Sequence, residues 1–170
     1  MNFLKNFFYI IFFLFVFTQN SFAKNLIAYI DLDLLLKNSE LGIKIYTDLD
    51  VKKNNEIQKI NHEENEIKKL ENEIRKKQNV LTKDEFKKEI EILKKKREDF
   101  KNFKNQAQKN FQKVKKERIS EFFKKVNPII QDYLDKNSID ILLNNKYVVM
   151  GKNKLDITEK IIEIVNKNLN

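Results

Sequence analysis

Apolar residues recur every seven positions along the middle of the chain in two successive series: Ile60, Ile67, Ile74 and Leu81, then Phe86, Leu93, Phe100, Ala107 and Val114. A seven-residue apolar repeat is typical of helices that pack side by side. Between the two series, Thr82-Lys83-Asp84-Glu85 has the Thr-x-x-Glu spacing of a capping box, which marks the start of a helix. The pattern predicts an antiparallel helical hairpin, here called the arm, over residues 43–126 with its turn near 80–83. One unbroken helix is the alternative, because Thr82 does not strongly interrupt a helix.

The apolar seam of this arm is imperfect. Charged residues occupy four positions at which a stable coiled coil has apolar side chains: Glu63, Lys77, Arg97 and Lys104. At about 1.5 Å per residue, the first helix of the arm is about 60 Å long. We therefore expect a long arm of marginal stability that can bend.

The two ends of the chain predict a small body that contains β-strands. Three runs rich in β-forming residues are predicted as strands: Asn25–Asp31, Ser138–Leu143 and Lys146–Met150. The last two would be joined by a hairpin turn at Asn144-Asn145. A short helix over Leu32–Lys37 and a final amphipathic helix that begins near Asp156 complete the pattern. The body comprises residues 24–42 and 127–170, and the arm is inserted between these two segments.

The size of this body predicts that it forms an oligomer. It has 63 residues, and below about 70–80 residues a single hydrophobic core rarely stabilises a domain alone. Its strands are also almost continuously apolar, which indicates burial on both faces. The predicted fold class is mostly α, with a long coiled-coil hairpin inserted in a short-stranded oligomerisation body.

The first residues have the pattern of an export signal. Lys5 precedes the uncharged apolar run Phe7–Phe17, and Ser21-Phe22-Ala23 places small residues where a signal peptidase cleaves. We expect residues 1–23 to be a signal peptide that is removed after Ala23. An uncleaved membrane anchor is the alternative, but a membrane-spanning helix needs about 20 apolar residues.

Positive charge is concentrated in the arm. Between Val51 and Ser120 there are 22 Lys and Arg against 13 Asp and Glu, whereas the rest of the mature chain is close to neutral. The densest cluster is Lys94, Lys95, Lys96 and Arg97. Such a surface attracts acidic partners and anionic membrane surfaces over a long range. The simpler interpretation is a solvated helix face.

Five apolar residues of the arm region lie off the predicted seam: Val51, Ile57, Ile92, Phe103 and Ile119. The hairpin does not need them for its own packing. They are candidates for transient contacts with another polypeptide, and the alternative is that they are scattered surface apolar residues.

The composition gives little support to an enzymatic function. The chain has one histidine, His62, no cysteine and only 2 glycines, so it offers no glycine-rich phosphate loop and no second His or Cys beside His62. Asp31 and Asp33 follow the first predicted strand, where an aspartate ordinarily caps a helix. We therefore predict no catalytic, metal or cofactor site.

The order of these features resembles the Skp/OmpH family of periplasmic chaperones. The resemblance is carried by IAYIDLDLLL at Ile27–Leu36, by LTKDE at the predicted turn, and by SIDILLNNKYVVMG followed by LDIT at Leu155–Thr158. It implies a homotrimer in which strands from three chains form the body and three hairpins surround a cavity. It also implies ATP-independent capture of unfolded outer-membrane proteins in the periplasm, without a cofactor.

Two other classes of function fit parts of the sequence. A sequence pI of about 9.5 and lysine-rich helices are typical of nucleic-acid-binding proteins, but an exported chain with few aromatic residues favours no specific nucleic acid. A purely structural coiled-coil protein of the envelope is the other alternative. It would require the arms to pair with a fixed partner.

Overall fold

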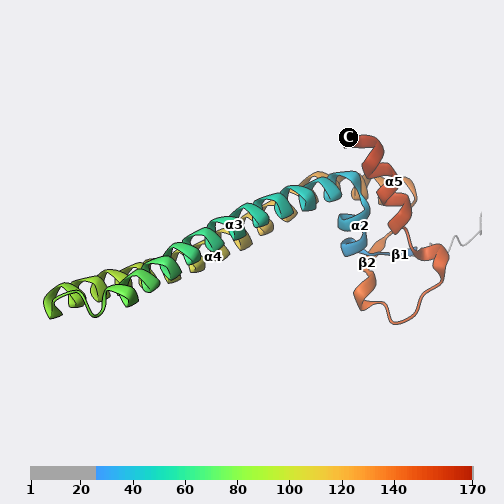
Figure 1. Ribbon diagram of the computed structural model, residues 1–170. Helices are drawn as coiled ribbons and strands as arrows, with labels where there is room; N and C mark the ends of the chain where they lie inside the picture. Colours follow the sequence, from blue (N-terminus) through green and yellow to red (C-terminus); the bar gives the residue numbers. More distant parts are fainter. Residues whose placement is uncertain (1–25, 170) are drawn as a thin grey trace, which may run out of the picture.

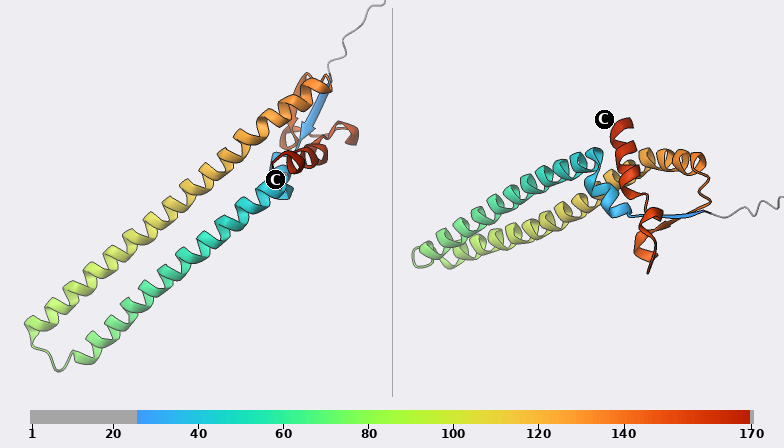
Figure 2. Two further views of the ribbon diagram at one scale, coloured as in Figure 1. Left: turned by 90° about the horizontal axis from the view of Figure 1, so that it is seen from above. Right: turned by 90° about the vertical axis from the view of Figure 1, so that its right-hand side faces the viewer.

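Two long antiparallel helices dominate the computed structural model, which describes residues 26–169. Helix α3 (Glu40–Lys77) leads away from a small body, and helix α4 (Lys83–Lys136) returns along it (Figures 1 and 2). Residues 78–82 connect them at the tip. The unbroken helix is therefore wrong, and the expected signal peptide lies outside the described residues.

Side-chain caps explain why the helices begin where they do. Before α3, the Ser39 hydroxyl accepts a hydrogen bond from the backbone N–H of Gly42 at 3.3 Å. Before α4, the Thr82 hydroxyl accepts from the N–H of Glu85 at 3.4 Å, and the Glu85 carboxylate accepts from the N–H of Thr82 at 3.0 Å. These bonds confirm the capping box and satisfy N–H groups that have no partner within the helix.

The seam of the arm is packed at Leu49 near the body, where 4% of the surface of that residue is exposed, and again in the distal half of the arm. Ile67, Ile74 and Leu93 are buried there, with further apolar residues packed against them: Leu70, Phe86, Ile90 and Phe100. Closer to the body, the seam residues Ile60 and Ala107 remain half-buried. The heptad pattern thus places the right residues between the helices, but burial follows only where apolar residues face each other.

The body packs three helical segments against a two-stranded parallel sheet. Strand β1 (Ile27–Ile30) pairs with β2 (Ile141–Asn144), with Ile27 aligned to Ile141. Helices α2 (Leu32–Asn38) and α5 (Thr158–Asn168) and the end of α4 enclose the core. Its buried residues are Ala28, Ile30, Leu35, Leu36, Phe122, Val126, Ile130, Ile157, Ile161, Ile162 and Val165.

Two polar contacts join the ends of the chain within the body. The N–H of Asp31 donates to the Thr158 hydroxyl at 2.9 Å. The N–H of Glu40 donates to the side-chain oxygen of Asn166, also at 2.9 Å. Helix α5 therefore fixes the corner from which α3 leaves the body.

The predicted third strand, Lys146–Met150, is wrong, and so is the hairpin turn at Asn144-Asn145. The side chain of Asn144 accepts a hydrogen bond from the N–H of Lys146 at 3.1 Å, and a 3-10 helix, η1 (Asn145–Tyr147), follows. The chain then leaves the sheet and returns through a second 3-10 helix, η2 (Asn153–Leu155), to a single bridge between Tyr29 and Asp156. The β-forming residues of this segment have no strand to pair with in the isolated chain.

Candidate functional site

The five candidate binding residues do not form a single site. Val51 and Ile57 on α3 and Ile92 on α4 are exposed, with exposed fractions of 57%, 42% and 51%. Phe103 is half-buried between the helices. Ile119 packs against the core of the body. The first three side chains are therefore available on the arm surface, whereas Ile119 contributes to packing.

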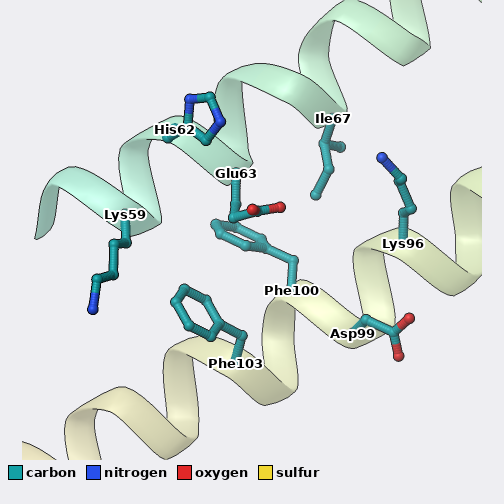
Figure 3. Close-up of a pocket in the computed structure, with 8 residues that line it drawn as sticks. All are labelled: Lys59, His62, Glu63, Ile67, Lys96, Asp99, Phe100 and Phe103. Atoms are coloured by element: carbon teal, nitrogen blue, oxygen red, sulfur yellow. The ribbon is translucent and has the colours of Figure 1, made fainter. Parts of the chain in front are cut away.

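A groove of about 520 Å³ lies between α3 and α4, partway along the arm. Ile67, Phe100 and Phe103 supply its apolar surface, and both aromatic rings face the gap between the helices (Figure 3). The groove exists because Glu63 occupies a seam position and is exposed. A carboxylate there cannot pack against the two phenylalanine rings without losing its hydration, so the space between the helices stays partly open.

Charged residues surround this groove, which we call the arm groove. Lys59, His62 and Glu63 line it from α3, and Lys96 and Asp99 line it from α4. The Asp99 carboxylate points away from the gap (Figure 3). Farther along α4, the Lys104 ammonium lies 5.4 Å from the centroid of the Phe100 ring, which is within the range of a cation–π contact.

The four basic residues at positions 94–97 differ in their contacts. All four side chains are exposed, but Arg97 donates from Nε to Oε1 of Glu71 at 2.9 Å and so links the two helices. Lys96 lines the arm groove. The basic residues therefore differ in role: Arg97 takes part in the packing of the arm, and Lys94 and Lys95 remain on its surface.

Four acidic residues of α3 take part in ion pairs: Glu56, Glu64, Glu66 and Glu71. Glu64 pairs with Lys68 at 2.9 Å, and Glu66 pairs with Lys69 at 2.8 Å. In each pair, the hydrogen bond from the lysine, followed by its positive charge, lowers the pKa of the glutamate. Both carboxylates are therefore held in the ionised, paired form. Helix α3 carries as many acidic as basic residues, so the excess positive charge of the arm lies on α4.

The body exposes many apolar side chains: Leu26, Ile27, Leu34, Ile141, Leu143, Tyr147, Val149 and Met150. Ile27 and Ile141 are aligned in the register of β1 and β2, so the exposed residues include one face of the sheet. Val149 and Met150 are 101% and 91% exposed. Parallel sheets in proteins are normally covered on both faces. The core covers one face of this sheet, whereas on the other face the Tyr29 hydroxyl donates to the carbonyl oxygen of Lys152 at 3.4 Å. Ile27 and Ile141 remain exposed on that other face. We call this region the open sheet face.

Sequence reasoning missed the arm groove, although the sequence contains a signal for it. Glu63 interrupts the apolar repeat, and the aromatic pair Phe100 and Phe103 lies on the other helix. His62 is exposed, and it also lies beside the groove. Asp31 caps α2 by accepting from the N–H of Leu34 at 2.9 Å, and this hydrogen bond lowers the pKa of its carboxyl group.

The described part of the chain holds neither a metal-binding cluster nor a membrane-spanning helix. Within residues 26–169, no group of three or more His, Cys, Asp or Glu side chains is arranged to hold a metal ion. In the same part of the chain, no helix combines the length and the apolar character that crossing a membrane requires.

Comparison with known proteins gives a consistent family and fold. The family described as Outer membrane protein (OmpH-like) matches residues 26–165, whereas no curated protein matches the sequence. The fold is similar to that of a crystal structure from Caulobacter crescentus CB15, described as an outer membrane chaperone (OmpH-like). The TM-score is 0.79 at 14% identity, over 86% of this chain and 87% of the other. This similarity confirms the predicted fold class, and the family match covers most of the sequence. The chain belongs to the OmpH-like family of outer membrane proteins.

Proposed function

We propose that this protein is an ATP-independent holdase chaperone of the periplasm, which binds unfolded outer-membrane proteins and prevents their aggregation. The observation that carries the proposal is that the arm exposes apolar side chains, in a chain that belongs to this family. Val51, Ile57 and Ile92 are exposed apolar side chains on otherwise highly charged helices. Such side chains can contact an unfolded chain while the charges around them keep the complex hydrated.

The open sheet face supports assembly as a homotrimer through the body. Ile27, Ile141 and Leu143 each expose more than two-fifths of their surface, and burying apolar surface stabilises a contact by about 25 cal/mol per Å². The segment Lys146–Met150 has β-forming residues but no partner strand in one chain. Pairing with a neighbouring chain would give it one. Three arms would then surround a common cavity.

Binding in this cavity would rely on many weak contacts. Each exposed side chain of the arm offers a small apolar area, and no single one of them holds a client. When several contacts form on one tethered polypeptide, each later contact forms at a high effective concentration. The client therefore stays bound as a whole while its segments exchange, which allows release without ATP.

The positive charge of α4 would attract clients and membrane surfaces. Lys94 and Lys95 are exposed in the densest part of this charge. A basic surface speeds the encounter with an acidic polypeptide, and it also favours contact with anionic lipid headgroups. Export by a signal peptide cleaved after Ala23 would place the chain in the compartment through which outer-membrane proteins pass.

The test is an aggregation assay without ATP. A urea-unfolded outer-membrane barrel is diluted into buffer with or without the mature chain, residues 24–170, and light scattering is followed. We expect the chain to suppress scattering in proportion to its concentration. A chain that assembles but leaves the barrel to precipitate would contradict the holdase function and would favour a structural coiled coil of the envelope.

A further inference from the structure

We propose that the arm groove is a side-chain-specific binding site, which takes one aromatic residue of an extended client segment whose neighbouring residues are acidic. This inference rests on the proposed function, because the ligand is part of a client polypeptide. It differs from the general apolar surface of the arm, since it assigns a defined site, a defined side chain and a defined charge pattern to the interaction.

The apolar part of the groove suits one aromatic ring. Phe100 and Phe103 face the gap (Figure 3), and Ile67 lies beside them with 8% of its surface exposed. Aromatic side chains prefer offset or edge-to-face contact with other rings, and such pairs add to the free energy of burial. The groove volume of about 520 Å³ is within the range of ligand-binding pockets.

Phe103 is the side chain most clearly available to a ligand. Phe100 packs against the distal cluster of Ile67, Ile74 and Leu93. Phe103 is half-buried and does not belong to that cluster. Its ring therefore contributes to the groove more than to the packing of the arm.

The charge at the edge of the groove favours acidic residues on either side of the bound aromatic residue. Lys96 and Asp99 are the charged residues that line the groove from α4, and the Asp99 carboxylate points away from the gap (Figure 3). The Lys104 ammonium lies 5.4 Å from the centroid of the Phe100 ring, so two cations of α4 lie at the groove. Among residues 26–169, none of the ion pairs includes Lys96. Its charge acts on the Glu66 carboxylate of α3, which is already paired with a lysine of its own helix, so the Lys96 ammonium group is available at the edge of the groove.

The α3 side of the groove determines on which side the acidic residues of the bound segment lie. Glu63 lines the groove from α3 and would repel a carboxylate on that side. Lys59, the basic residue of α3 at this groove, already pairs with Glu56 at 2.9 Å. Acidic residues of the client would therefore lie along α4. In an extended strand, residues two positions apart point to the same side about 6.6 Å apart, so acidic residues two positions from the aromatic one can reach this edge.

The test measures binding of short synthetic peptides to the full mature chain by fluorescence anisotropy. The first peptide has a central Phe with Asp two positions away on each side in a Gly/Ser background. In the second, Ala replaces the Phe, and in the third, Lys replaces each Asp. We expect the first peptide to bind. Replacing its Phe should weaken binding by about tenfold or more, because the burial of one aromatic side chain is lost. Replacing each Asp by Lys should also weaken binding by about tenfold, because it places like charges beside Lys96. Equal binding of all three peptides would overturn the proposal.

Two variants separate the site from the stability of the arm. Phe103→Ala removes one ring of the groove, and we expect about tenfold weaker binding of the first peptide. Glu63→Leu fills the seam with an apolar side chain, so we expect a higher melting temperature of the arm together with loss of peptide binding. Val80→Ala changes an exposed apolar residue at the tip, where 83% of its surface is exposed, and should leave peptide binding unchanged.

The outcomes distinguish this inference from the proposed function. If Phe103→Ala and Glu63→Leu bind the first peptide as well as the wild type while the barrel stays soluble, the groove is not the site and the holdase function stands. Failure of the wild type to keep the barrel soluble rejects the proposed function. If Phe103→Ala instead abolishes self-association of the chain, the groove is occupied by a second copy, and the proposal is wrong.

Discussion

Replacing the three exposed apolar residues of the arm should weaken client binding without weakening the fold. The variant is Val51→Ser, Ile57→Ser and Ile92→Ser. Serine has nearly the same helix propensity as valine and isoleucine, and about half of each native side chain is already exposed. We therefore expect the helical content and the melting temperature to change little.

The size of the effect follows from the exposed fractions. Full burial of a Val or Ile side chain contributes about 1.5–3 kcal/mol, and only about half of each surface is available to a client here. Each contact is then worth about 1 kcal/mol, and three contacts on one arm about 3 kcal/mol. This corresponds to an increase in Kd of about 100-fold when all three side chains touch the same client.

The assay is a fluorescence titration of a labelled, urea-unfolded barrel with the wild type and the variant. A matched control replaces three exposed polar residues of the same helices, Asn55→Ser, Asn61→Ser and Asn102→Ser, and should bind as the wild type does. An unchanged Kd for the apolar variant, with the fold intact, would refute the assignment of these residues to client binding.

Three further predictions concern the turn, the body and the charge of the arm. Thr82→Ala removes the capping box and should lower the free energy of unfolding by about 1 kcal/mol, measured by urea denaturation. Hydrogen bonds from the Thr82 hydroxyl and N–H lower the pKa of Glu85 in the folded chain. The cap therefore stabilises the fold above the ordinary glutamate pKa of about 4.3, and this stabilisation is lost as the pH falls through the lower pKa of the folded state. Thr82→Ala should reduce this pH dependence. Gly42→Ala would place a Cβ 1.7 Å from the carbonyl oxygen of Leu36, and the backbone shift should cost about 2 kcal/mol or more, seen as a lower melting temperature. Client capture should slow as salt rises, because screening shortens the reach of the Lys94–Arg97 cluster from about 10 Å at 0.1 M to about 3 Å at 1 M; a capture rate that is independent of salt would contradict the electrostatic part of the proposal.

The elements of the arm could be predicted from the sequence because their determinants are local. The Thr82–Glu85 capping box involves residues three positions apart, and both hydrogen bonds form as the pattern predicts. The seven-residue repeat likewise places Ile67, Ile74 and Leu93 between the helices. Neither feature depends on distant parts of the chain.

The third strand could not be predicted in the same way, because strand formation depends on a partner. The apolar pattern of Lys146–Met150 is that of a strand, but Tyr147 and Val149 remain 74% and 101% exposed. Their apolar side chains form a surface that a single chain leaves exposed. The error is therefore consistent with the assembly proposed for the body.

The candidate site was only partly accessible from the sequence. Val51, Ile57 and Ile92, which lie off the predicted seam, are exposed, because a heptad separates the inner from the outer face of a helix. Phe103, in contrast, is half-buried between the helices. The role of these residues in client binding stays a prediction. Off-seam position could not show that Ile119 packs against the body, since that contact depends on how the arm joins it. The arm groove requires the relative position of Glu63 and Phe103 on two helices, which the sequence alone does not give.

The most direct test of the central claim is the mass of the mature chain, residues 24–170, measured by light scattering after size exclusion, alone and with an unfolded outer-membrane barrel in buffer without ATP. The proposed function requires a mass of three chains for the free protein, and of three chains plus one barrel for the complex. A mass of one chain, or a barrel that precipitates and never elutes with the trimer, would contradict it.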